Sequence, residues 1–356
     1  MKNKCYINGL GIVSAQNTKE DFLKEIIEYK DTTQVPALKQ NYKEYIPPAL
    51  IRRMGKAVKN GVVASSNAMK DAVVNEIDGI IVGTGIGSAK DSEKFLESMI
   101  QYNEEYLTPT PFIQSTHNTI AGQIALGIES KAYNFTYVQA ANSFQSALLD
   151  GLMQIQSEDK ENILVGGMEE IGSFTQGLYR LVGFYKKVEE GEHSIFQPKS
   201  SGGVQGEGGA FMILSNQKQA STYAECVDVE MKNHIEEGKL KDFTLNFLKR
   251  NGLSTQDIDA VILGNNGDVK YDHIYEEMSA ILEKSTSLYF KHLFGDFYSS
   301  SSIATWIASN ILKNQEIPET LYHPNSSKRN PRTIENILIF NQTRGRDYSL
   351  ILLKNV

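Results

Sequence analysis

The sequence predicts an α/β protein whose strands are buried on both faces. Short apolar runs bounded by glycine alternate along the chain with longer stretches of helical period. Low-complexity linkers are absent from the sequence. With 356 residues, the chain holds enough apolar material for two domains or one large duplicated domain.

The predicted strands are short, apolar and rich in β-branched residues. They span residues 5–7, 79–82, 135–138, 163–165, 210–214, 260–263, 288–290, 337–340 and 349–353. Apolar residues recur with helical spacing in the longer segments between them. The predicted helices span residues 19–29, 52–71, 90–102, 143–156, 240–251 and 300–313.

Three segments of the first half recur in the same order in the second half. The pairs are 78–87 with 259–267, 162–165 with 336–339, and 211–216 with 350–355. One such match between apolar strands is weak, but the common order indicates two copies of one unit. We therefore predict an N-terminal half, residues 1–217, and a C-terminal half, residues 218–356.

Charge and composition exclude several classes of protein. The net charge is −7, and no block of Lys and Arg offers a surface for nucleic acid or for an anionic membrane. No stretch of about 18 uncharged apolar residues predicts a membrane span, so we expect a cytoplasmic protein. Two cysteines, Cys5 and Cys226, and scattered histidines give neither a disulfide framework nor a metal site.

Six motifs together resemble a β-ketoacyl-carrier-protein synthase, a condensing enzyme of the thiolase-like fold. They lie at residues 6–14, 80–87, 108–122, 163–170, 206–214 and 291–295. The resemblance implies a duplicated fold with five layers, α/β/α/β/α. It also implies a dimer that pairs through residues 108–118 and 134–139.

The nucleophile of the family is missing from its motif. Such enzymes hold a cysteine thiolate at a helix N-terminus, within Thr-Ala-Cys-x-x-Gly, and load the acyl chain on it. The resemblance places Ala141 at that position, and alanine forms no thioester. If the alignment is shifted by one or two residues, Asn142 or Ser143 takes the cysteine position. Of these two, only Ser143 carries a group that can act as a nucleophile.

The two histidines that stabilise the enolate in this family are also replaced. The resemblance places Gly264 at the first position and Asp296 at the second. A carboxylate at the second position repels an enolate. Lys291 keeps its family position. Two interpretations of it stay open: it pairs with Asp296 or Asp272 as the remainder of the site, or it is one surface lysine among many.

The resemblance therefore implies a catalytically degenerate synthase similar to a chain-length factor. Such a protein pairs with a cysteine-bearing ketosynthase in fatty-acid or polyketide pathways, including aryl-polyene pathways, and carrier proteins bring the acyl chains. We expect a heterodimer with that homologue or a homodimer, an acyl carrier protein as a further partner, and no cofactor.

Two alternatives stay open at this point. One is an active acyltransferase or 3-oxoacyl-carrier-protein synthase with a shifted nucleophile, Ser143 or Cys226. The other reads Gly83-x-Gly85-x-Gly87 as a nucleotide phosphate loop. Its spacing departs from Gly-x-Gly-x-x-Gly, and no clear ribose-binding acid follows about 20 residues later.

Overall fold

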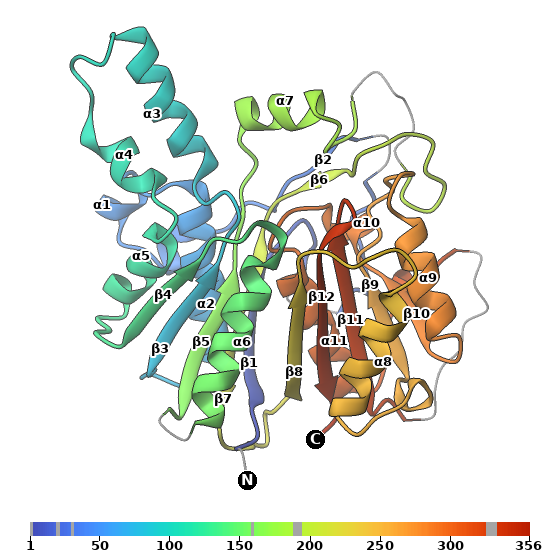
Figure 1. Ribbon diagram of the computed structural model, residues 1–356. Helices are drawn as coiled ribbons and strands as arrows, with labels where there is room; N and C mark the ends of the chain where they lie inside the picture. Colours follow the sequence, from blue (N-terminus) through green and yellow to red (C-terminus); the bar gives the residue numbers. More distant parts are fainter. Residues whose placement is uncertain (1–2, 19–21, 30–31, 158–159, 188–193, 325–332) are drawn as a thin grey trace.

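Ten of the strands form one long mixed sheet that bends into two five-stranded halves. The computed structural model describes residues 3–18, 22–29, 32–157, 160–187, 194–324 and 333–356 (Figure 1). The first half contributes β1 (Tyr6–Val13), β3 (Gly79–Gly83), β4 (Tyr133–Tyr137), β5 (Asn162–Gly167) and β7 (Gly209–Ser215). The second half contributes β8 (Ala224–Lys232), β9 (Ala260–Leu263), β10 (Thr286–Tyr289), β11 (Asn336–Thr343) and β12 (Arg346–Lys354).

The helices alternate with these strands as the sequence predicts for an α/β protein. The first half contains α1 (Pro48–Ile51), α2 (Lys56–Ala72), α3 (Ala89–Gln101), α4 (Pro109–Ser115), α5 (Thr119–Gly127), α6 (Ser143–Gln156) and α7 (Ser173–Leu181). The second half contains α8 (Leu240–Arg250), α9 (His273–Ile281), α10 (Lys291–Phe294) and α11 (Ser301–Asn314). A two-strand ladder joins β2 (Gln34–Val35) to β6 (Gln205–Gly206), and the 3₁₀ turns are η1 (Tyr42–Glu44), η2 (Ala140–Asn142), η4 (Thr255–Asp257) and η5 (Glu319–Leu321).

Alternate residues of each strand face two different helix layers. In β5, Leu164 packs with α2 and α5, whereas Ile163 and Val165 pack with α6 and α11. In β11, Leu338 packs with α8 and α9, and Ile339 faces α6 and α11. The helices α6 and α11 therefore lie between the two sheet halves, which confirms the predicted α/β/α/β/α layers.

The second half repeats the strand order of the first. From edge to junction the first half runs β4-β3-β5-β7-β1, and the second runs β10-β9-β11-β12-β8. The same aspartate contact recurs in both: Asp78 Oδ2 accepts the backbone N–H of Asn162 at 3.0 Å, and Asp259 Oδ2 accepts that of Asn336 at 2.9 Å. The boundary that we predict at residues 217/218 lies between β7 and β8 and stays a prediction.

The predicted helix at residues 19–29 is wrong where the structure describes it. Residues 19–21 lie outside the described ranges, and residues 22–29 form bends and coil. Leu23 is fully buried in the central core, and Gln16 bonds both backbone groups of Ile27. Contacts with distant residues therefore determine this segment and override its helical period. By contrast, α6 begins and ends at the predicted residues.

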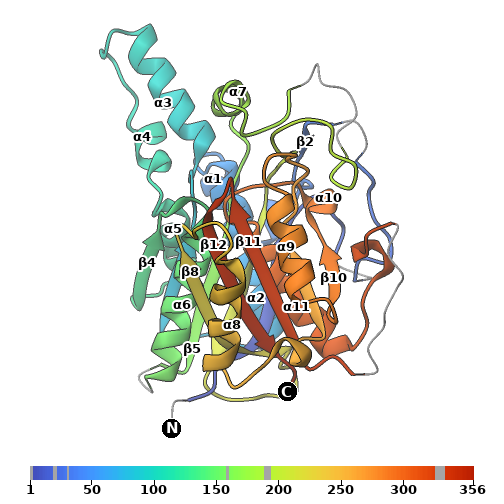
Figure 2. The same cartoon turned by 45° about the vertical axis from the view of Figure 1, so that its right-hand side comes forward.

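Helices α3 and α4 project from the first half as an arm. Figures 1 and 2 show the arm beside α7, away from the layered body. None of the helices within the described ranges combines the length and the apolar character needed to cross a membrane.

Candidate functional site

Ala141 lies where a turn delivers the chain into the central helix layer. It belongs to η2, directly before α6, and its side chain is buried. Ala140, just before it, has a φ of 47°, so this turn holds a non-glycine residue in the left-handed region. The turn and the buried helix N-terminus are therefore present, while the side chain at residue 141 carries no reactive group.

Ser143 and Asn142 stabilise this turn. The Ser143 hydroxyl donates to the Ala140 carbonyl at 2.7 Å and accepts the Gln139 backbone N–H at 2.8 Å. Asn142 donates its backbone N–H to the Gln139 carbonyl at 3.0 Å. Since a backbone carbonyl holds the Ser143 proton in place of a base, the arrangement does not activate this hydroxyl as a nucleophile.

Gly264 follows β9, and its neighbours leave no room for a side chain. A Cβ atom built there would lie 2.9 Å from the Tyr275 hydroxyl oxygen and closer still to Asn341 Oδ1. Tyr275 donates its hydroxyl to Asn341 Oδ1 at 3.0 Å. The Asn341 amide therefore fills the space beside Gly264, the residue that we match by prediction to the family's first histidine.

Asp296 is held by a buried positive charge. Lys291 Nζ lies 2.6 Å from Asp296 Oδ1, and both side chains are buried. Asn266 Nδ2 donates to Asp296 Oδ2 at 2.8 Å, and Lys291 also donates to Asn341 Oδ1 at 3.2 Å. The expected pairing of Lys291 is thus with Asp296.

Asp272 secures the loop that follows Gly264. Its carboxylate accepts the backbone N–H of Gly267 at 2.9 Å and that of Asn266 at 3.4 Å. Burial raises the pKa of Asp272 to about 6, and these two hydrogen bonds and the charge of Lys291 oppose the rise. Asn266 therefore links Asp272 to the Lys291–Asp296 pair, because its backbone N–H bonds to Asp272 and its side chain bonds to Asp296.

One hydrogen-bond network connects these positions to α6 and α11. Asn341 Nδ2 donates to Ser301 Oγ at 3.1 Å. Gln145 Nε2 donates to Ser301 Oγ and to Ser349 Oγ, both at 2.9 Å. Gln145 lies one helical turn after Ala141, so side chains around Ala141, Gly264 and Asp296 converge, and their polar groups largely satisfy one another.

Several members of this network were not predicted from the sequence. They are Gln145, Asn266, Tyr275, Ser301 and Ser349. The sequence marks Asn341, because it follows the apolar run 337–340 and begins the segment 341–345, which stands where the resembled family has a Gly-Phe-Gly-Gly loop. The structure buries its side chain to 3% exposure. A buried amide in a strand needs partners for both of its polar atoms, and here the partners come from three other elements.

The glycine-rich turn after β3 is occupied by a carboxylate. Gly85 and Ile86 direct their backbone N–H groups at the buried Glu169 side chain. Burial raises the pKa of Glu169 to about 7. Because these are the groups that a phosphate loop uses to bind its ligand, the nucleotide interpretation of residues 83–87 is disfavoured.

Cys226 is buried in the junction strand β8. Burial raises the pKa of its thiol to about 12, and the nearby carboxylates add to this effect. A thiol in this state is protonated at neutral pH and is a poor nucleophile. The structure therefore disfavours both shifted nucleophiles, Ser143 and Cys226.

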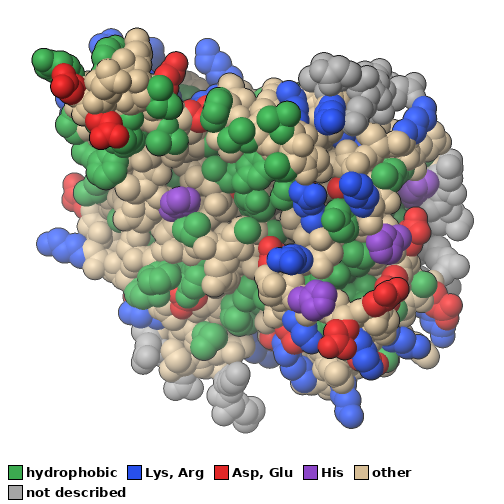
Figure 3. Space-filling model, turned by 45° about the horizontal axis from the view of Figure 1, so that its top comes forward, with side chains coloured by type: hydrophobic (Ala, Val, Ile, Leu, Met, Phe, Trp, Pro, Cys, Tyr) green, Lys and Arg blue, Asp and Glu red, His purple; other side chains and the backbone are tan. Residues whose placement is uncertain are grey.

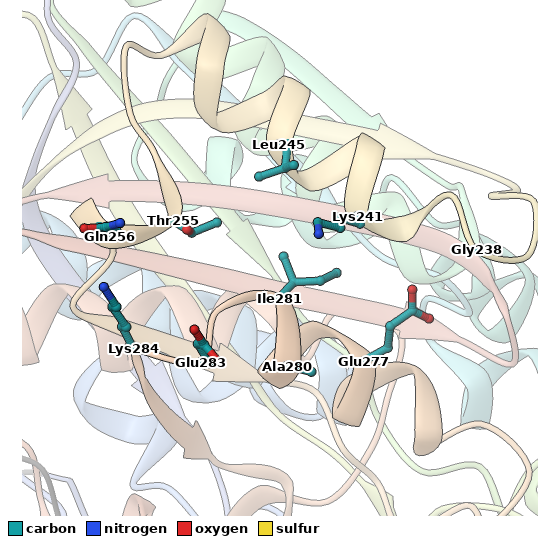
Figure 4. Close-up of a pocket in the computed structure, with 10 residues that line it drawn as sticks. All are labelled: Gly238, Lys241, Leu245, Thr255, Gln256, Glu277, Ala280, Ile281, Glu283 and Lys284. Atoms are coloured by element: carbon teal, nitrogen blue, oxygen red, sulfur yellow. The ribbon is translucent and has the colours of Figure 1, made fainter.

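A groove lies apart from this network, between α8 and α9. It has a volume of about 760 Å³, and Figure 4 shows Leu245 and Ile281 between the charged side chains of Lys241, Glu277 and Lys284. None of the network residues lines it.

A known family model matches the sequence, and solved structures match the fold. The family model for the β-ketoacyl synthase N-terminal domain matches residues 7–220, and no curated protein matches the sequence. The ishigamide ketosynthase/chain length factor superposes with a TM-score of 0.82 at 14% identity, covering 100% of both chains. A β-ketoacyl synthase from Burkholderia phymatum STM815 gives 0.81 at 18% identity, again over 100% of both chains.

A third structure is the ketosynthase ApeO in complex with its chain length factor ApeC from Xenorhabdus doucetiae. The TM-score is 0.79 at 14% identity, covering 99% of this chain and 98% of the matched chain. At these identities the likeness establishes the fold. The predicted thiolase-like fold is therefore confirmed.

Proposed function

The chain belongs to the β-ketoacyl synthase family, and from this premise we propose that it is a non-condensing, chain-length-factor-like subunit. In this proposal it pairs with a cysteine-bearing ketosynthase in polyketide or fatty-acid biosynthesis. The pair acts in the cytoplasm on acyl chains that a carrier protein brings, and this subunit uses no cofactor of its own. An aryl-polyene pathway is one setting for such a pair.

The observation that carries the proposal is the position of Asn341 beside Gly264. Decarboxylative condensation needs donors that point at a developing enolate oxygen. Here the Asn341 amide fills the first donor position, and its hydrogen bonds run to Tyr275, Lys291 and Ser301 within the protein. At the second position, the buried Asp296 neutralises Lys291. This arrangement favours a structural role over condensation.

The surface of the first half supports a role as a partner subunit. β4 is an edge strand of the sheet, and its aromatic side chains Tyr133, Phe135 and Tyr137 stack along one face. Tyr133 and Phe135 are 39% and 45% exposed. An exposed apolar edge strand has unpaired backbone N–H and C=O groups, which can pair with a strand of another chain.

Further exposed apolar side chains lie on the arm and on α7. They include Leu96, Ile100, Tyr106, Phe112, Ile113, Phe174, Leu178 and Leu181. Figure 3 shows hydrophobic side chains on the arm and on the adjoining part of that face. An apolar surface of this kind marks an interaction site, and its place beside β4 favours one partner that covers both.

Two measurements test the proposal. The purified protein is incubated with acyl and malonyl carrier-protein thioesters, and mass spectrometry follows adducts and β-keto products. We expect neither, with an active synthase as the positive control. An adduct or a product formed by this chain alone would overturn the non-condensing role.

Co-expression with a cysteine-bearing homologue tests the pairing. We expect the two chains to co-purify, and we expect Phe135→Lys on β4 to abolish the complex by placing a charge in the apolar edge. Leu245→Lys, a similarly exposed leucine on α8, is the matched control and should leave the complex intact. A homodimer of this chain that excludes the synthase would contradict the heterodimer.

A further inference from the structure

A second cavity opens beside the replaced nucleophile position. It has a volume of about 300 Å³, and its lining includes Ala140, Tyr298, Arg344 and Arg346. Arg344 lies in the turn between β11 and β12, Arg346 is the first residue of β12, and Ala140 directly precedes Ala141. The cavity therefore runs from that hairpin to the turn that would hold a catalytic cysteine.

The charge of this cavity is positive. Two guanidinium groups line it, against one carboxylate, Asp347. Asp347 accepts a hydrogen bond from Asn233 Nδ2 at 2.8 Å. Within the described part of the chain, neither arginine has a carboxylate oxygen within ion-pair distance. Both guanidinium groups therefore keep donors free for an added anion.

Arg344 is held in place before any ligand arrives. Its guanidinium carbon lies 5.4 Å from the centre of the Phe184 ring and 6.0 Å from that of Tyr271, and Nη1 donates to the Val182 carbonyl at 3.4 Å. These contacts fix one side of the guanidinium plane, so little side-chain entropy remains to be lost on binding.

The rest of the lining suits an apolar body attached to the anion. Phe184, Tyr271 and Tyr298 contribute aromatic rings, and Thr343 contributes a hydroxyl group. A guanidinium fork binds carboxylate and phosphate oxygens through paired N–H donors. A volume of about 300 Å³ is at the small end of ligand sites, so a small ligand or one end of a longer one fits.

We propose that this cavity binds an oxyanion, a phosphate or a carboxylate, that Arg344 and Arg346 hold while its apolar part contacts Phe184 and Tyr298. The inference deepens the proposed function and rests on it, since it makes the non-condensing subunit a binding subunit. The two oxyanions share this chemistry, and they differ in whether the apolar part carries a phosphate ester or a free acid.

Isothermal titration of the full chain with inorganic phosphate and, separately, with benzoate tests the site. We expect saturable binding of at least one probe, weakened by added salt. Arg346→Gln should weaken binding at least about tenfold, because it removes a charged hydrogen-bond donor. Arg346 is exposed, so this variant should fold normally. Arg344→Lys keeps the charge but loses the fork, and we expect a similar loss.

Lys241→Gln is the matched control, since it removes one positive charge from the groove of Figure 4 and should not change binding. Binding of phosphate alone assigns a phosphate ester, and binding of benzoate alone or more tightly assigns a free acid. Absence of binding, or binding that is insensitive to both arginine variants, would overturn the inference. Failure of this inference can be distinguished from failure of the proposed function. The proposed function is overturned by condensation catalysed by this chain alone, or by its failure to pair with a ketosynthase.

Discussion

Lys291 and Asp296 form a buried ion pair, with 2.6 Å between Nζ and Oδ1. Removal of one charge from such a pair leaves the other buried without compensation. We predict that Asp296→Asn lowers the free energy of unfolding by about 3–5 kcal/mol, measured by urea denaturation.

The control is the exposed pair Lys239–Asp242, at 3.0 Å on the surface of α8. Water screens such a pair, so Asp242→Asn should change stability by less than about 1 kcal/mol. A loss as small for Asp296→Asn as for Asp242→Asn would contradict the structural role of the buried pair.

Restoring a side chain at residue 264 should destabilise the protein. A Cβ atom there meets Asn341 and Tyr275, so Gly264→Ala should cost about 1–3 kcal/mol through overpacking. Gly264→His should cost more, and adding Asn341→Gly should recover part of the loss because it removes the obstructing amide. Thermal and urea denaturation measure all three variants.

Gly122 provides a matched glycine for this test. It lies within α5, and a Cβ atom built there meets nothing within 4 Å. Gly122→Ala should therefore be neutral or stabilising by about 0.5–1 kcal/mol, since alanine favours a helix over glycine. Similar losses at residues 122 and 264 would contradict the part assigned to Asn341.

Glu169 should make stability depend on pH. Burial raises the pKa of its carboxyl from 4.5 to about 7 in the folded protein. Between these values the unfolded chain releases a proton that the folded protein keeps, so stability falls as the pH rises. Urea denaturation measures the free energy of unfolding of both proteins. The value for Glu169→Gln, relative to that of the parent protein, should increase by about 2–3 kcal/mol from pH 5 to pH 8.

Asp272 also has a raised pKa, to about 6, and contributes to the pH profile of both proteins. Only the difference between the two profiles therefore reports on Glu169. The exposed Glu97 on α3 is the control, and Glu97→Gln should give a curve parallel to that of the parent protein. A constant difference between Glu169→Gln and the parent across this range would refute the prediction.

Both cysteines should resist thiol reagents in the folded protein. Cys5 and Cys226 are 1% exposed, and burial raises the pKa of each thiol. With a disulfide reagent at pH 8, we expect almost no reaction in native buffer and two equivalents in guanidinium chloride. If one thiol is labelled rapidly in the native state, the Cys226→Ala variant identifies which one reacts. Rapid labelling of Cys226 would contradict the prediction and would support Cys226 as a nucleophile.

The sequence predicted every strand of the ten-stranded sheet except β8, including β4, whose residues are partly exposed. Acidic residues interrupt the apolar residues of β8 (Ala224–Lys232), so no apolar run marks this strand, and it was not predicted. The helices α5, α7 and α9 were also missed. The short α4 and α10 contain too few residues for a period to emerge.

The site was predictable only in part, for a physical reason. Resemblance placed Ala141, Gly264 and Asp296, but it could not show what fills the space around them. Asn341 adjoins Gly264 because β9 and β11 pair in parallel with Leu263 beside Phe340. That neighbourhood depends on strand order, which a local pattern does not encode.

The central helix layer makes the two halves depend on each other for folding. α6 comes from the first half and packs against β8 of the second, while α11 comes from the second and packs against β7 and β1 of the first. Within the ten-stranded sheet, the ladder that connects the halves pairs Tyr6 with Glu225 and Ile7 with Ala224. A chain cut between β7 and β8 should therefore yield fragments that regain cooperative unfolding only when mixed.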